Sequence, residues 1–154
     1  MNCLNIPKGY SKEYCSPELF KYFNISKIEN PMINPIQSEI YSLGIFMLKI
    51  MGYFKFNTNS LSFDDFKRDY EAHKSIIDSI DFFVGTDANE LEKNIIKVIK
   101  MCLNYDPLKR LSVEELLNIL ENLNSKTLIE IQKDYELFQQ MRKNNVQSEK
   151  LKKV

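Results

Sequence analysis

The chain has 154 residues, which is enough for one domain with a hydrophobic core. Its hydrophobic fraction of 44% and charged fraction of 27% are ordinary for a soluble globular protein. Lys+Arg and Asp+Glu number 21 each, so no net charge is available to attract nucleic acid or an anionic membrane.

The first 37 residues are predicted to be mainly loop, because four of the five prolines of the chain lie there. A short helical turn fits residues 17–23, since Pro17 would then occupy a first-turn position where its missing N–H does no harm.

Residues 36–52 are predicted to form a strong helix. Apolar residues recur at three- and four-residue steps, and further apolar residues fill most of the remaining face. A helix that is apolar nearly all round usually lies buried at the centre of a domain. Gly52 follows the last apolar position as the expected C-terminal cap.

Three further helices have recognisable N-terminal capping boxes. Ser62 with Asp65 precedes a helix that runs toward Ile80. Asp87 with Glu90 and Ser112 with Glu115 are predicted to begin helices over residues 91–103 and 116–123. Each cap is worth about 1 kcal/mol, so the caps place boundaries rather than determine the fold.

The last segment, residues 127–154, is predicted to contain one docking helix. Leu128, Ile131, Tyr135 and Phe138 follow a 3-4-3 spacing, after which the sequence becomes polar and basic and is expected to fray. No long strand-like alternation occurs anywhere in the chain, so the predicted fold class is mainly α.

Cysteine and histidine usage argues against disulfide and zinc chemistry. Cys3, Cys15 and Cys102 are odd in number and far apart, and His73 is the single histidine. The N-terminal residues contain no apolar run typical of a signal peptide, and the most apolar stretch, about twelve residues long, is too short to cross a bilayer. We therefore expect a cytoplasmic, intracellular protein with neither a metal site nor a membrane segment.

Three sequence segments carry a resemblance to a known family. They are residues 14–19 (Y-C-S-P-E-L), residues 38–45 (S-E-I-Y-S-L-G-I) and residues 102–112 (C-L-N-Y-D-P-L-K-R-L-S). In this order they resemble the Y-x-A-P-E, S-D-V-W-S-L-G-V and C-L-x-x-D-P-x-x-R-P-T motifs in the second half of a eukaryotic protein kinase domain. The resemblance covers about residues 9–123.

The resemblance implies a fold and a division of the chain. Residues 1–125 would form the helical large lobe of a protein-kinase-like fold, truncated at its N-terminal side. Residues 126–154 would add a C-terminal amphipathic helix and a polar tail.

The resemblance also implies a buried ion pair between Glu18 and Arg110, whose planar guanidinium can meet a carboxylate with two parallel hydrogen bonds. Glu39 stands where the family has an Asp that holds the catalytic loop, and its extra methylene puts that contact in question. Phe46 and Ile50 match positions beneath the adenine in the family, although ordinary core packing predicts the same burial for them.

Two sets of residues match the family's structural positions. The lobe-bracing motif residues are Pro17, Glu18, Glu39, Gly44, Asp106 and Arg110, and the end of the activation segment is marked by Ser11, Tyr14 and Ser16.

The groups that bind ATP and transfer phosphate have no counterpart in the sequence. A kinase needs a Gly-rich loop, a strand Lys, the catalytic Asp of H-R-D and the magnesium-binding Asp of D-F-G. The four glycines form no such loop, and His73 is followed by Lys and Ser. We therefore predict no catalytic, cofactor-binding or metal-binding residue in this chain, with ATP and Mg implied only for a complete parent kinase.

Three functional hypotheses remain open. In the first, the chain is a fragment of a protein Ser/Thr kinase domain, and its partner is the missing N-terminal part of that domain. Alternatively it is a non-catalytic, kinase-like binding or scaffold module, which would dock a protein partner through residues 53–83 or through apolar surface left uncovered. The third hypothesis is an unrelated all-α protein with chance motif matches.

Overall fold

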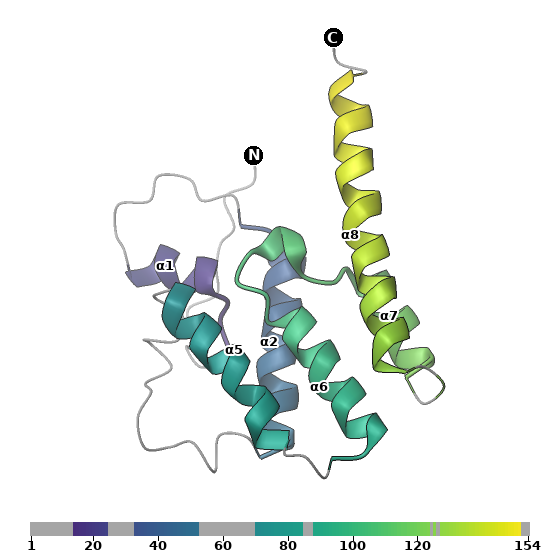
Figure 1. The fold of residues 1–154 in the computed structure, drawn as a ribbon. Coiled ribbons are helices and arrows are strands. Elements are labelled where there is room, and N and C mark those ends of the chain that lie inside the picture. Colours follow the sequence, from purple (N-terminus) through teal and green to yellow (C-terminus); the bar gives the residue numbers. More distant parts are fainter. Residues whose placement is uncertain are drawn as a thin grey trace.

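The computed structural model describes residues 14–24, 33–52, 70–84, 88–123, 125 and 127–151. The elements are α1 (Pro17–Asn24), α2 (Pro35–Ile50), α5 (Tyr70–Val84), α6 (Glu90–Cys102), the 3-10 turn η1 (Pro107–Lys109), α7 (Val113–Glu121) and α8 (Leu128–Leu151) (Figure 1). The described segments contain helices and no strand, which confirms the predicted mainly-α class.

Helix α2 has clear signals at both ends. The Asn34 side chain accepts hydrogen bonds from the N–H groups of Ile36 and Gln37, and Pro35 occupies the first turn. At the other end, Gly52 has a φ of 80° and donates its N–H to the Lys49 carbonyl. The predicted glycine cap is therefore confirmed, because glycine adopts positive φ without steric cost.

The starts of the later helices agree only in part with the sequence. Ser112 and Glu115 form the predicted capping box of α7. The capping residue of helix α6 lies two residues later than predicted, at Asn89, which forms the capping box with Glu92. The predicted pair Asp87 and Glu90 and the observed pair Asn89 and Glu92 fit the same capping-box pattern, so the pattern alone could not select between them. The proposed Ser62 box lies outside the described residues.

The core consists of two clusters that share α2 and α6. The first is formed by Tyr41, Ile45, Leu48, Ile80, Ile96, Ile99 and Leu103. The second is formed by Ile40, Val98, Met101, Cys102, Leu111, Leu116, Ile119 and Ile131. Because α2 and α6 contribute to both clusters, the two helices connect the α5 side of the molecule with the α7–α8 side (Figure 1).

The two shared helices approach closely at Gly44, one of the predicted bracing residues. A Cβ atom at this position would lie 2.9 Å from the Leu103 side chain and 3.1 Å from the Cys102 Cβ. The absence of a side chain therefore allows α2 and α6 to pack at this distance.

Helix α2 is not buried all round, which corrects one prediction. Phe46 is 50% exposed and Ile50 is 70% exposed, so neither interpretation that had them buried holds. Ile36 and Leu43 are exposed on the same side. The described elements pack on only part of the helix circumference, and the amino-acid pattern of α2 did not reveal which part stays open.

Helix α8 also differs from the sequence prediction, because it continues as a helix to Leu151 instead of fraying after Phe138. Figure 1 shows this helix running well past the other elements toward the C-terminus. Residues 139–151 contain neither Gly nor Pro and are rich in Gln, Lys, Arg and Glu, which lose little side-chain freedom in a helix. Polarity alone was therefore a poor indicator of fraying.

Candidate functional site

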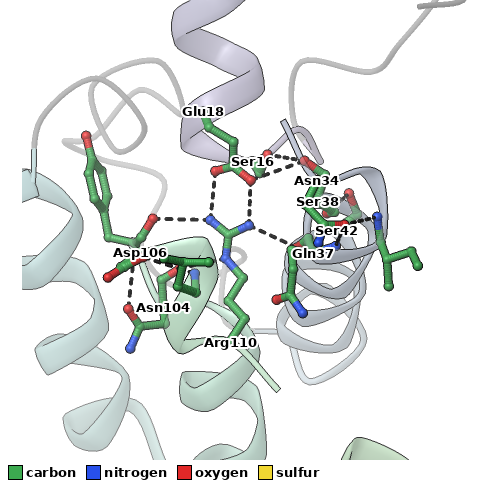
Figure 2. A network of polar contacts seen from close by, with 12 residues as sticks. Ser16, Glu18, Asn34, Gln37, Ser38, Ser42, Asn104, Asp106 and Arg110 are labelled. Atoms are coloured by element: carbon green, nitrogen blue, oxygen red, sulfur yellow. Dashed lines mark hydrogen bonds and ion pairs between the residues drawn. The ribbon is translucent and has the colours of Figure 1, made fainter. Parts of the chain in front are cut away.

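Arg110 and Glu18 form the polar centre of the molecule. Arg110 is fully buried, and its Nη1 and Nη2 donate to the two carboxylate oxygens of Glu18 at 2.6 and 2.8 Å (Figure 2). Burial opposes ionisation of Glu18, but the hydrogen bonds and charge of Arg110 outweigh it and hold the pKa of this carboxyl below its usual value. The predicted bidentate ion pair is confirmed.

The remaining N–H groups of Arg110 bind backbone carbonyls. Its Nε donates to Asn104 O at 2.7 Å, its Nη1 also donates to Gln37 O, and its Nη2 also donates to Tyr105 O. All five donors of the guanidinium are therefore engaged inside the protein. The group is fixed as a structural brace and offers no N–H to an external phosphate.

The turn that presents Arg110 is built by its own polar side chains. Asn104 Oδ1 accepts the N–H of Asp106, and Asp106 Oδ1 accepts the N–H of Leu108. These two bonds shape the backbone that enters η1, where Pro107 needs no N–H partner. Asp106 thus supports the position of Arg110 through the backbone of the turn.

Serine hydroxyls join α2 to the segment around Ser16. The hydroxyl oxygens of Ser16 and Ser38 are 2.6 Å apart, and Ser38 donates to Glu18 Oε1 (Figure 2). Ser42, one turn later on α2, donates to Tyr14 O at 2.9 Å. Sequence reasoning missed both α2 serines as functional positions, although their i, i+4 spacing in S-E-I-Y-S places them on one face of the helix.

The other predicted motif residues are distributed differently. Pro17 is buried at the first position of α1, and the Tyr14 ring lies 4.3 Å from Lys49 Nζ, which also donates to its hydroxyl. Glu39 is exposed on α2, apart from the bonds around Arg110. Ser11 lies outside the described residues.

His73 was not predicted as part of this region, yet it packs beside the ion pair. Its ring centroid lies 5.2 Å from that of Tyr105 and 6.0 Å from that of Tyr41, over which the Arg110 guanidinium also stacks. Burial, followed by the charge of Arg110, lowers the pKa of His73 to about 4. The imidazole is therefore neutral at pH 7 and fills space between two aromatic rings.

An exposed apolar row runs along α2. It consists of Ile36, Leu43, Phe46 and Ile50, and Glu39 lies in line with them. These positions are three, four or seven residues apart, so they share one side of the helix. A row of large apolar side chains in water is typical of a contact surface.

Metal-binding and membrane-crossing features are both missing from the described part of the chain. No three His, Cys, Asp or Glu residues there gather as metal ligands. None of the described helices combines the length and the apolarity that a bilayer crossing requires.

The comparisons with known proteins add no relative. No protein-family model, curated protein or solved structure matches this chain.

Proposed function

We propose that this chain is the closing part of a protein-kinase-type large lobe. The observation that carries the proposal is the bidentate Glu18–Arg110 pair, which joins two of the three kinase-like segments across 92 positions of sequence. Ser38, in the remaining segment (residues 38–45), donates to the same carboxylate. Three motifs that are separate in sequence thus meet at one partly buried carboxylate, as bracing residues of a lobe would.

In this proposal the chain supplies support and not chemistry. The Glu18–Arg110 pair and the turn at Asp106 hold the segment around Ser16 against α2 and η1. The groups that bind ATP and magnesium belong to a further polypeptide segment, and the complete kinase transfers the γ-phosphate of ATP to a protein Ser or Thr hydroxyl.

The test compares two proteins. One is the 154-residue chain, and the other is the protein encoded by any transcript that extends the same reading frame upstream of Met1, called here the extended product. We expect no thermal shift when Mg-ATP is added to the chain alone. The extended product is expected to show a shift and to phosphorylate Ser/Thr peptides with labelled ATP. An Arg110→Lys variant of the extended product should lose both properties together, because its lobe is no longer braced.

Two results would contradict the proposal. One is a transcript with an in-frame stop codon directly before Met1 and no H-R-D sequence further upstream. The other is tight Mg-ATP binding by the 154-residue chain itself, since its bracing residues contain no phosphate-binding group.

A second candidate function, a non-catalytic binding module, is favoured by the exposed row on α2. Ile36, Phe46 and Ile50 each keep half or more of their surface in water. Covering them would release a hydrophobic free energy of about 25 cal/mol for each Å² of apolar surface removed from water. This candidate requires a partner for α2, whereas the kinase proposal requires the further segment.

A further inference from the structure

The exposed row on α2 has the geometry of a helix-pairing seam. Ile36, Leu43 and Ile50 are seven residues apart, and Glu39 and Phe46 each lie three residues after a member of that series. This is the spacing of the a and d positions of a heptad, which pair with another helix along their length. The seam therefore fits a helical partner better than a loop or a strand.

Glu39 restricts the identity of that helix. Its carboxylate lies within the seam, so a partner that covers the row must place a cation opposite it or leave a charge without compensation. Pairing of α2 with α2 of a second copy fails this requirement. A parallel pair opposes two Glu39 carboxylates, and an antiparallel pair centred on Leu43 places each carboxylate against Met47.

The exposed apolar side chains of α7 are also unsuitable. Val113, Leu117 and Leu120 are exposed, but Glu114 and Glu121 are exposed beside them. Helix α7 contains no Lys or Arg that could lie opposite Glu39, so its carboxylates would face Glu39 without a compensating cation.

Helix α8 presents the complementary pattern. Ile129 is 67% exposed, and Leu137 and Met141 are each 53% exposed. Lys133 is exposed between them, and the four residues follow each other at steps of four, which forms a ridge along the helix surface. Among the described helices, α8 therefore offers an apolar row that contains a cation.

The two rows also match in register when the helices run parallel. Let Glu39 lie opposite Lys133. On α2, Ile36 then lies three residues before Glu39, and on α8, Ile129 lies four residues before Lys133. Leu43 and Leu137 each lie four residues after the charged residue of their own helix. Phe46 lies seven residues after Glu39, and Met141 lies eight residues after Lys133. One residue of offset is about 1.5 Å along a helix, which side chains of this length can absorb.

We propose that the chain self-associates, with the α8 row of a second copy docked on the α2 row. Each copy carries both rows, so a two-fold dimer contains the α2–α8 contact twice. Two such contacts are needed, because one short seam is small beside the roughly 1,200–2,000 Å² buried in a stable interface. The inference deepens the binding-module candidate and stands on α2 and α8 alone, independently of the kinase proposal.

The experiment measures the mass of the 154-residue chain by light scattering and sedimentation between about 1 and 100 µM. We expect a concentration-dependent dimer. Glu39→Lys and Lys133→Glu are each expected to weaken the dimer about tenfold or more, because each reversal places like charges opposite one another in both contacts. Lys74→Glu, at an exposed position on α5, is the matched control and should leave the dimer unchanged.

Mixing the two variants provides a sharper test. In a mixed dimer, the two substituted side chains face each other with opposite charges in one contact, and the native Glu39 and Lys133 face each other in the second contact. Association should therefore return to within about threefold of the wild type. Circular dichroism spectra establish that each variant is folded, which is expected because both positions are exposed.

Three results would each overturn the proposal. They are a wild-type monomer at about 100 µM, a dimer that is indifferent to Lys133→Glu, and a mixture of the two variants that stays monomeric. None of these results bears on the ATP-binding test, so the failure of this inference and the failure of the kinase proposal are distinguishable.

Discussion

At the scale of single residues, Arg110 has the most demanding environment in the described structure. Its side chain is fully buried, and it binds one carboxylate and three backbone carbonyls that come from α1, α2 and the turn before η1. A guanidinium can serve these acceptors because its five donors lie in one fixed plane. No other side chain reproduces that arrangement.

We therefore expect Arg110→Lys to destabilise the protein by roughly 3–5 kcal/mol, because Lys keeps the charge but cannot supply the paired donors to Glu18 together with the donors to three carbonyls. Urea unfolding followed by circular dichroism measures the loss. Lys109→Ala is the control, since its side chain is 63% exposed and its contact with Asp106 is long at 3.9 Å. A loss below about 1 kcal/mol for Arg110→Lys would show that the pair contributes little.

The sequence revealed some of these residues and not others, for a physical reason. Glu18 and Arg110 lie in motifs whose residue types and order are unusual enough to be recognised. Ser38 also lies in a recognised motif, but a serine fits many environments, so its contact with Glu18 was not predicted. His73 lies outside the three motifs. Their roles depend on tertiary neighbours, namely Ser16 for the first and the Tyr105 ring for the second.

At the scale of elements, the packing of α2 on α6 depends on Gly44. We expect Gly44→Ala to cost roughly 1–3 kcal/mol, because the new methyl would press on Leu103 at 2.9 Å inside a filled core. Helix propensity opposes this effect, since Ala favours a helix over Gly by about 1 kcal/mol. Thermal unfolding shows whether Gly44→Ala lowers or raises the stability. An increase in melting temperature would mean that Leu103 moves aside at little cost.

Helix α8 is attached to the Arg110 turn by three side chains. Tyr135 and Gln139 both donate to the Lys109 carbonyl. Arg142 donates to the carbonyls of Leu108 and Arg110 and forms an ion pair with Glu115. The carbonyls that η1 leaves without internal partners are thus satisfied by α8.

Removing the longest of these side chains should loosen α8. We expect Arg142→Ala to cost about 2 kcal/mol, because it deletes charged hydrogen bonds from a side chain that is 28% exposed. Hydrogen exchange of the α8 amides should accelerate at the same time. Lys143→Ala, at the next and exposed position, should change stability by less than about 0.5 kcal/mol. Unchanged exchange in Arg142→Ala would indicate that apolar packing alone holds the helix.

The same attachment explains why the sequence described α8 incompletely. Its apolar residues predicted docking up to Phe138, and Ile131, Tyr135 and Phe138 do belong to or pack on the second core cluster. The anchoring beyond that point uses Gln139 and Arg142, which look like surface residues in the sequence. Polar side chains that bind backbone carbonyls leave no apolar period to detect.

At the scale of the whole molecule, the helical class and the central place of α2 followed from hydrophobic periodicity, but the exposed side of α2 did not. The residues of α2 are apolar on nearly every side, so their pattern cannot distinguish a face that meets α6 from one that meets water. Which side stays open depends on the positions of the other helices.

The pH dependence of global stability is also a property of the whole fold, and His73 contributes to it between pH 4 and 6.5. His73 is the single histidine of the chain, and its pKa falls from 6.5 to about 4 on folding because burial and the charge of Arg110 disfavour the protonated ring. Between these two pH values the unfolded chain binds a proton that the folded protein does not. The contribution of His73 to the free energy of unfolding is therefore at its full value above pH 6.5 and decreases as the pH falls toward 4.

The expected loss is about 2 kcal/mol at about pH 5 and about 3 kcal/mol at about pH 4, at roughly 1.36 kcal/mol for each pH unit below the unfolded pKa. Urea midpoints at about pH 7.5, 6 and 5 measure it, since Glu18, whose folded pKa lies below 4.5, adds its own loss only at lower pH. His73→Gln is the control, because it keeps a polar side chain without a titrating ring. Its stability should be nearly constant over this interval. A wild-type midpoint that does not move between about pH 7.5 and 5 would mean that the folded protein admits the proton, and hence that the space between Tyr41 and Tyr105 is open to water.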